Sequence, residues 1–235
     1  KNRERSRQAN NRSLRLGRLR KAKECIKYVR VSLFITCLAD ALYPEVGEAT
    51  VRLLNHFGIY VHFPEQQTCC GQPAFNAGHL REAKEVARSM VEAFKDSDYI
   101  VCPSGSCTGM IKHYYQSLFN GHSSGNGATV KHLVENTYEL TQFLVHVVGL
   151  EKIRGYFPYK VTYHPSCHMM RLLGVREEPY LLLNRMEGLN LVELPYKEDC
   201  CGFGGTFSVK MGDVSNAIVT EKVKHVLSTG AEILT

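Results

Sequence analysis

Two pairs of adjacent cysteines, each followed by glycine, are the residues of this chain whose spacing points most clearly to chemistry. They are Cys69-Cys70-Gly71 and Cys200-Cys201-Gly202. A disulfide between neighbouring residues would close a strained ring, and two adjacent thiolates repel each other unless a cation binds both. Glycine after the pair permits a positive φ and lets a bulky inorganic ligand approach the backbone. The pattern therefore indicates metal ligation.

The two triplets belong to a longer repeat. Shifting the sequence by 131 residues lays the first triplet on the second and brings Cys37 within one residue of Cys167. We interpret this as an internal duplication of roughly a hundred residues. The candidate ligands are Cys37, Cys69, Cys70 and Cys107 in the first set and Cys167, Cys200 and Cys201 in the second. The counterpart of Cys107 would fall at position 238, so the second repeat is expected to be truncated and its set to lack one sulfur.

Zinc and iron–sulfur clusters are the two kinds of centre that four thiolates suit. Structural zinc usually binds two CxxC knuckles on short loops, whereas these sulfurs come from three segments about thirty residues apart. That spacing favours a polynuclear cluster. Two alternatives stay open. One is a thiol/disulfide enzyme that uses Cys69 and Cys70 directly, and the other is a zinc-stabilised assembly module without a redox role.

Other residues near the cysteines are weaker candidates for a role in the site. Cys102 ends an apolar segment and is interpreted as a core residue. His164 and His168 flank Cys167, and either could hydrogen-bond a cluster sulfur, relay a proton or act as a ligand. A surface or helix-capping role for these histidines is an equal alternative. Arg171 could neutralise a carboxylate or a cluster charge, although a solvated surface position is favoured for it.

The cysteines follow segments that are predicted to be strands. In the first half, strands are expected over 29–37, 59–63 and 98–102, with helices over 44–57 and 78–95. In the second half, strands are expected over 160–164, 189–194 and 231–234, with helices over 178–185 and 210–228. A flexible loop over 120–127 and a helix over 131–148 are expected in between. This alternation predicts an α/β fold of two duplicated Rossmann-like halves, with parallel sheets and the Cys-Cys-Gly loops at strand ends.

Charge is distributed unevenly along the chain. Residues 1–30 hold 12 Lys and Arg against two Asp and Glu, whereas the remainder holds 17 against 21. We expect a basic tail over 1–29 that is disordered or non-native, a first cysteine-rich repeat over 30–128, a connecting helix over 129–159 and a second repeat over 160–235. The mildly acidic body gives no reason to expect a nucleic-acid partner. The sequence shows no transmembrane run and no secretory signal, and its free thiols point to the cytoplasm.

The cysteine pattern resembles the cysteine-rich CCG domain, which occurs twice in iron–sulfur oxidoreductase subunits. As in that family, Cys37 is separated from the first triplet by 31 residues, and Cys167 from the second by 32. The segments Pro103–Cys107, Ser166–Val175 and Cys200–Met211 resemble those of the lactate-utilization subunits within the family. Where the family carries a CxxC motif, Ser104 stands in place of its first cysteine.

The resemblance implies an iron–sulfur subunit of an assembly that oxidises L-lactate to pyruvate and passes the electrons onward. It also implies that the seven candidate cysteines hold an iron–sulfur cluster of the 4Fe-4S type, with cubane and noncubane forms both open. The sequence carries no flavin or nicotinamide fingerprint. Other subunits of the complex are therefore expected as partners, and the small-molecule substrate is expected to be reached through them.

Overall fold

A computed structural model describes residues 29–119, 127–150, 153 and 155–235. The basic tail predicted over 1–29 and the loop predicted over 120–127 lie outside the described residues, apart from the last residue of each. Within the described ranges, no helix combines the length and the apolar character that a membrane span needs.

The first half contains a parallel sheet of four strands. These are β1 (Val31–Leu33), β2 (Val61–His62), β3 (Tyr99–Cys102) and β4 (Thr137–Glu139), in the spatial order β2-β1-β3-β4. Val31 pairs with Val61 on one side and with Tyr99 on the other. The strands are joined by α2 (Cys37–Leu42), α3 (Pro44–His56), α4 (Gln72–Asn76), α5 (Leu80–Ala93), α6 (Gly105–Phe119) and α7 (Gly127–Asn136).

The second half repeats this topology with three strands. They are β5 (Lys160–Thr162), β6 (Asn190–Val192) and β7 (Ile233–Leu234), and the parallel order β6-β5-β7 matches β2-β1-β3. The second half contains η2 (His168–Leu172), a short π-helix, together with α9 (Glu178–Leu183), α10 (Thr206–Lys210) and α11 (Gly212–Ser228). The predicted α/β fold of two duplicated halves is therefore confirmed.

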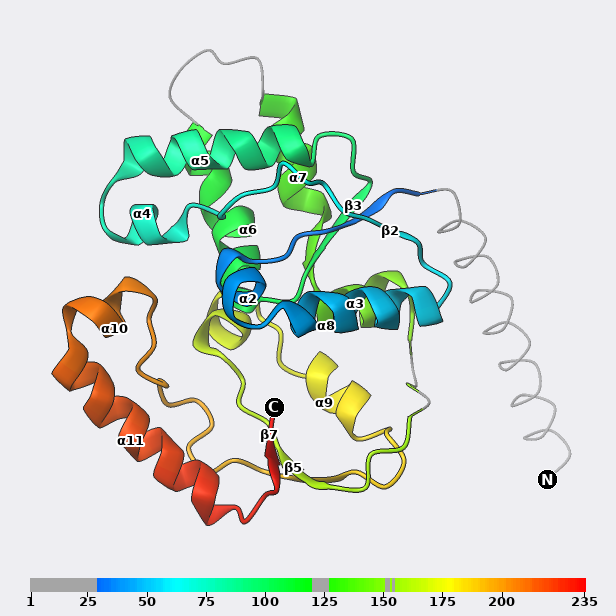
Figure 1. Ribbon diagram of the computed structural model, residues 1–235, viewed down its shortest axis with the longest axis vertical. Coiled ribbons are helices and arrows are strands. Elements are labelled where there is room, and N and C mark those ends of the chain that lie inside the picture. Colours follow the sequence, from blue (N-terminus) through cyan, green and yellow to red (C-terminus); the bar gives the residue numbers. More distant parts are fainter. Residues whose placement is uncertain (1–28, 120–126, 151–152, 154) are drawn as a thin grey trace, which may run out of the picture.

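Successive residues of the central strands point to opposite faces of the first sheet, and each face has its own apolar core. Val101 packs with Leu54 and Phe143 in one cluster, whereas Ile100 packs with Phe94 in the other. Helices α5, α6 and α7 supply most of the second cluster and lie together on one side of the sheet (Figure 1). Both faces of the sheet are thus covered, as parallel sheets require.

One predicted element between the halves is wrong. The helix expected over 131–148 is interrupted after α7 by strand β4, which pairs with β3, and the chain continues through α8 (Leu140–Gln142) and the π-helix η1 (Phe143–Val147). The Thr137 hydroxyl donates to the Leu133 carbonyl 2.7 Å away where α7 ends. The Glu139 carboxylate then accepts from the Thr141 N–H at 2.8 Å and begins α8. These two side-chain hydrogen bonds end α7 and begin α8. They divide the segment 131–148, whose apolar periodicity predicts one continuous helix.

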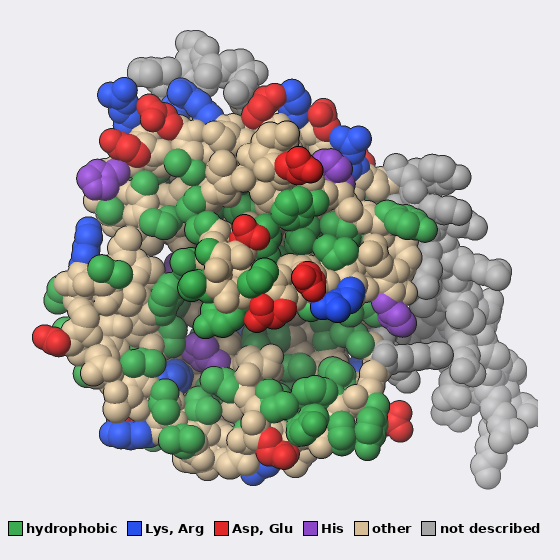
Figure 2. Space-filling view, in the orientation of Figure 1, with side chains coloured by type: hydrophobic (Ala, Val, Ile, Leu, Met, Phe, Trp, Pro, Cys, Tyr) green, Lys and Arg blue, Asp and Glu red, His purple; other side chains and the backbone are tan. Residues whose placement is uncertain are grey.

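The two halves are joined where η2 packs on α6. A Cβ added at Gly105 would lie 2.3 Å from Met169 Cγ, and one at Gly109 would lie 2.5 Å from Leu172 Cδ2. Glycine at both positions lets the two backbones approach closely. The surface is hollowed between the upper and lower parts of the molecule in Figure 2.

Substituting Gly105 with alanine should destabilise the protein by about 1–3 kcal/mol, since overpacking at a tight contact forces neighbouring groups apart. The added Cβ would also lie 3.0 Å from the Met169 backbone nitrogen, which cannot swing away as a side chain can. Urea unfolding would measure the loss. Gly127→Ala is the matched control, because Gly127 also begins a helix but has open space around its Cβ position. Equal stability of the two variants would contradict the prediction.

Candidate metal centre

The first set of cysteines lies at the carboxyl ends of three neighbouring parallel strands, the edge where open α/β sheets bind ligands. Cys37 follows β1 and begins α2, whose first turn is capped by the Thr36 hydroxyl accepting from the Ala39 N–H at 3.3 Å. Cys69 and Cys70 follow β2 and precede α4. Cys107 follows β3 in the first turn of α6. The sheet order thus gathers residues that are far apart in the sequence.

The four sulfur atoms of this set are joined pairwise in a row. Cys37 Sγ lies 3.6 Å from Cys69 Sγ, and the Cys70 thiol hydrogen-bonds with both Cys69 and Cys107. Cys37 is exposed, Cys69 is half-buried, and Cys70 and Cys107 are buried. The row therefore runs from the surface into the core, and the structure brings together all four residues that the sequence predicted for the first site.

The pKa values of the four cysteines differ in direction along the row. The hydrogen bond from Cys70, helped by the Gly71 N–H, lowers the pKa of Cys69 to about 5, and the same neighbour lowers the pKa of Cys107. Burial and the adjacent Cys69 raise the pKa of Cys37 to about 11. Hydrogen bonds to Cys107 and Cys69, with burial, raise the pKa of Cys70. The pKa therefore falls at Cys69 and Cys107 and rises at Cys37 and Cys70, and a bound cation would release the protons that remain on the sulfurs.

The glycine of each triplet has the conformation that the sequence predicted. Gly71 and Gly202 both have a φ of 84°, in the left-handed region. The Gly71 N–H lies 3.5 Å from Cys69 Sγ, and the Gly202 N–H lies 3.3 Å from Cys200 Sγ. Each triplet therefore turns back on itself and directs a backbone donor at the sulfur of its own first cysteine.

The three cysteines of the second set follow the strands that correspond to β1 and β2. Cys167 follows β5 and precedes η2, and Cys200 and Cys201 follow β6. Burial raises the pKa of Cys167, and its electrostatic interaction with Cys200 and Cys201 raises it further. Cys167 Sγ lies 3.8 Å from Nδ1 of His168.

The two histidines beside Cys167 differ in their surroundings. Burial lowers the pKa of both His164 and His168, and the nearby Lys222 lowers that of His164 further. Both ring nitrogens of His164 are buried without a hydrogen-bond partner. Arg171 is exposed, as the sequence favoured, and donates to the Glu198 carbonyl at 2.6 Å.

Two contributions to the first site were missed from the sequence. No helix was expected over residues 105–119, yet α6 places Cys107 and presents Tyr115 to the triplet. The Tyr115 hydroxyl is buried and donates to the Cys70 carbonyl at 2.9 Å. A tyrosine eight residues after a cysteine is consistent with two helical turns, which is the signal that could have found it. Cys102 is fully buried in the core, in agreement with its interpretation as a packing residue.

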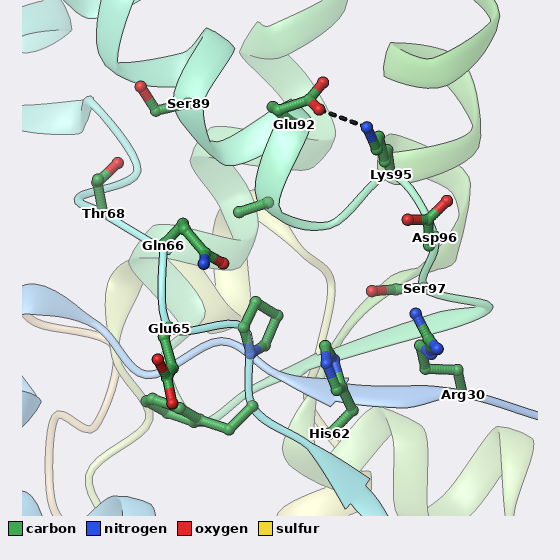
Figure 3. A pocket seen from close by; sticks show the side chains of 13 residues that line it. Arg30, His62, Glu65, Gln66, Thr68, Ser89, Glu92, Lys95, Asp96 and Ser97 are labelled. Carbon is green, nitrogen blue, oxygen red and sulfur yellow. Dashed lines mark hydrogen bonds and ion pairs between the residues drawn. The ribbon is translucent and has the colours of Figure 1, made fainter.

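A groove of about 790 Å³ lies beside the first set and is lined from β2 and α5. Its lining reaches Thr68, the residue before Cys69, and extends to Arg30 (Figure 3). Glu92 and Lys95 form an ion pair at its rim. The groove carries both signs of charge and no sulfur, so it adds no ligand to the cysteine row.

The chemistry of the donors suits a thiophilic metal centre. Cysteine sulfurs select zinc and iron–sulfur clusters, and the first set offers four of them from three strand ends. Among the residues that the structure describes, no three His, Cys, Asp or Glu side chains are arranged around one point as a single metal ion would require. The first set fits a cluster by its donor type and number, while the second set offers three of the four sulfurs that such a centre uses.

Comparison with known proteins gives the family. The model of the cysteine-rich domain CCG matches residues 31–112 and again residues 161–235. The chain belongs to this family. Its domain boundaries, predicted over 30–128 and 160–235 with a connecting segment, stay a prediction.

Several curated relatives align with most of this chain. It is 52% identical over 206 residues to lactate utilization protein A 2 of Bacillus cereus strain Q1, an alignment that covers 88% of this chain and 85% of the relative. It is 53% identical over 206 residues to lactate utilization protein A of Halalkalibacterium halodurans, covering 88% and 84%. Lactate utilization protein A 1 of Bacillus anthracis is 50% identical with 88% and 85% covered. Within the cysteine-rich CCG family, the chain therefore belongs with lactate utilization protein A.

Proposed function

We propose that this chain is an iron–sulfur electron-transfer subunit of an oxidoreductase that oxidises L-lactate to pyruvate in lactate utilization. The observation that carries the proposal is the row of four thiols at the ends of three parallel strands, in a chain about half identical to proteins named for lactate utilization. An iron–sulfur cluster held there would supply one-electron redox chemistry.

The residues of the chain would act by holding and shielding such a centre. Cys37, Cys69, Cys70 and Cys107 would be the ligands of the first site, and Cys167, Cys200 and Cys201 would contribute to the second. The Gly71 N–H would keep its bond to sulfur, which raises the reduction potential of a thiolate-bound cluster. Tyr115 fixes the backbone at Cys70 from the buried side and excludes water there.

Partner subunits follow from the chemistry of the reaction. Oxidation of lactate to pyruvate removes two electrons and two protons, whereas an iron–sulfur centre accepts electrons singly. A hydride-accepting group on another subunit would therefore divide the electron pair before it reaches this chain. We place the assembly in the cytoplasm, where free thiols persist.

An anaerobic count of iron, acid-labile sulfide and zinc, combined with a visible spectrum, would test the proposal on the purified chain. Iron and sulfide in equal amounts with a brown absorbance are the expected result. A colourless protein with about one zinc, still without iron after anaerobic reconstitution, would establish the zinc-stabilised module instead. A metal-free protein whose Cys69 and Cys70 oxidise reversibly by two electrons would establish the thiol/disulfide enzyme.

A further inference from the structure

One side chain ties together the two segments that carry Cys37 and Cys69. Ile35 lies two residues before Cys37, and Gln67 lies two residues before Cys69. The side-chain oxygen of Gln67 accepts from the Ile35 N–H at 2.9 Å, and its Nε2 donates to the Leu33 carbonyl at 3.2 Å. The amide of Gln67 therefore holds the strand end before Cys37 against the loop before Cys69.

The two segments place a pair of sulfur atoms in contact. Cys37 Sγ donates to Cys69 Sγ at 3.6 Å. Cys37 is exposed at the start of α2, and Cys69 is half-buried in the irregular segment between β2 and α4. The sulfurs need to approach by about 1.5 Å to form an S–S bond. Because Cys69 lies outside helix and strand, its segment can make this movement without breaking a strand pairing.

The other neighbouring pairs in the row are less suited to a disulfide. Consecutive Cα atoms are about 3.8 Å apart across a trans peptide, which is below the range of about 4.4–6.8 Å that disulfides prefer, so a bond between Cys69 and Cys70 would be strained. Cys70 and Cys107 are both buried, and oxidants reach exposed sulfurs first. The pair of Cys37 and Cys69 alone in this row combines contact, access from solvent and freedom from that strain.

We propose that the first site, when it holds no metal, closes a reversible disulfide between Cys37 and Cys69. Closure takes two of the four sulfurs from the site, so no cluster can be assembled there until a reductant reopens the pair. It also protects both sulfurs from further oxidation to sulfinic acid, which is not reversed by thiols. This role in metal loading rests on the proposed iron–sulfur function, whereas formation of the disulfide does not.

A peroxide is the oxidant of the closing reaction. The exposed Cys37 sulfur attacks one oxygen of hydrogen peroxide, the O–O bond breaks, and Cys37 becomes a sulfenic acid as water leaves. The Cys69 sulfur, which has the Gly71 N–H at 3.5 Å, then attacks Cys37 Sγ, so that the S–S bond forms and a second water leaves. The two thiols lose two electrons and two protons, which reduce the peroxide to water. A dithiol reverses the reaction by attacking the exposed Cys37 sulfur and becoming a disulfide itself.

Peptide mapping of the full chain, prepared metal-free and treated with an equimolar amount of hydrogen peroxide, would test the proposal. After alkylation of the remaining thiols and digestion with trypsin, Cys37 lies on peptide 31–52, and Cys69 and Cys70 lie on peptide 53–81. We expect these two peptides to be linked. Two of the nine thiols should be lost, and both should be regained with dithiothreitol.

Cysteine variants assign the bond. Cys70→Ala should keep the link between the two peptides, whereas Cys69→Ala should abolish it. Cys37→Ser should leave Cys69 without a partner, so that peroxide in excess converts Cys69 to a sulfinic acid that dithiothreitol does not reverse.

Glutamine variants test how the pair is positioned. Gln67→Ala should slow closure by about tenfold, because the two sulfurs are then held in contact less of the time. Gln66→Ala is the matched control, since Gln66 is the exposed neighbour on the same loop and its loss should leave the rate unchanged. Equal rates in the two variants would overturn the positioning role of Gln67.

Three results of the mapping would overturn the disulfide itself. They are a bond within peptide 53–81, a link from that peptide to peptide 96–112, which carries Cys107, and sulfinic acid at Cys37 without any disulfide. Anaerobic iron uptake separates this inference from the proposed function. A chain that closes the disulfide but takes up no iron would overturn the function alone, and a chain that takes up iron but closes no disulfide when metal-free would overturn this inference alone.

Discussion

Alanine at Gly202 should destabilise the protein by about 3 kcal/mol or more. The positive φ of 84° costs an L-residue about 1–2 kcal/mol by itself. The added Cβ would also lie 2.6 Å from the Ser215 carbonyl oxygen, a backbone atom that cannot move without shifting α11. Ser215 further ties the loop to the helix, since its hydroxyl donates to the Gly202 carbonyl at 2.9 Å. Urea unfolding of the metal-free chain would measure the change.

Gly58→Ala separates the two causes. Gly58 has a φ of 77° but nothing within 4 Å of its Cβ position, so alanine there should cost only the backbone strain of about 1–2 kcal/mol. If Gly202→Ala proved no more costly than Gly58→Ala, close approach of the triplet to α11 would not be what requires glycine.

Serine at Cys69 should remove the centre at the first site. Cys69 is central in the sulfur row, contacting Cys37 at 3.6 Å and hydrogen-bonding with Cys70, and its pKa of about 5 makes it the thiolate most ready to bind a metal. A serine hydroxyl stays protonated at neutral pH and is a poor ligand for a thiophilic metal. Iron and sulfide should fall to the amount held by the second set, about half of the total or less.

Cys102→Ala is the control for that substitution. Cys102 is fully buried and its thiol donates to the Ser104 carbonyl at 3.7 Å, outside the sulfur row. Alanine there should cost about 1 kcal/mol of stability through the small cavity, with the iron and sulfide content unchanged. Loss of iron in Cys102→Ala, or its retention in Cys69→Ser, would show that the ligand set is assigned wrongly.

The parts of the fold that the sequence predicted are those with strong local patterns. Helix α3 has a proline at its start and Gly58 just past its end, α5 has one apolar face, and β3 is a short apolar run. The duplicated Cys-Cys-Gly spacing then fixed which strands are equivalent. The convergence of four cysteines followed from parallel strands ending at one edge.

Other parts depend on contacts that no local pattern reveals. Helix α6 begins with Gly105 and carries Gly109, both weak helix formers, and it is held in place by η2 from the other half. Strand β4 exists because β3 offers an edge to pair with.

The strand order also bears on how the protein is made. In each half the first strand is central and pairs with two later strands, so neither sheet is complete until its last strand has been synthesised. Strand β4 ends at Glu139, and β7 ends at Leu234, 95 residues later. At about 5–20 residues per second this interval lasts roughly 5–20 s, far longer than a small domain needs to fold. The first four thiols can therefore be gathered on the ribosome before the second triplet exists, and metal loading of the two halves would be separate events in time.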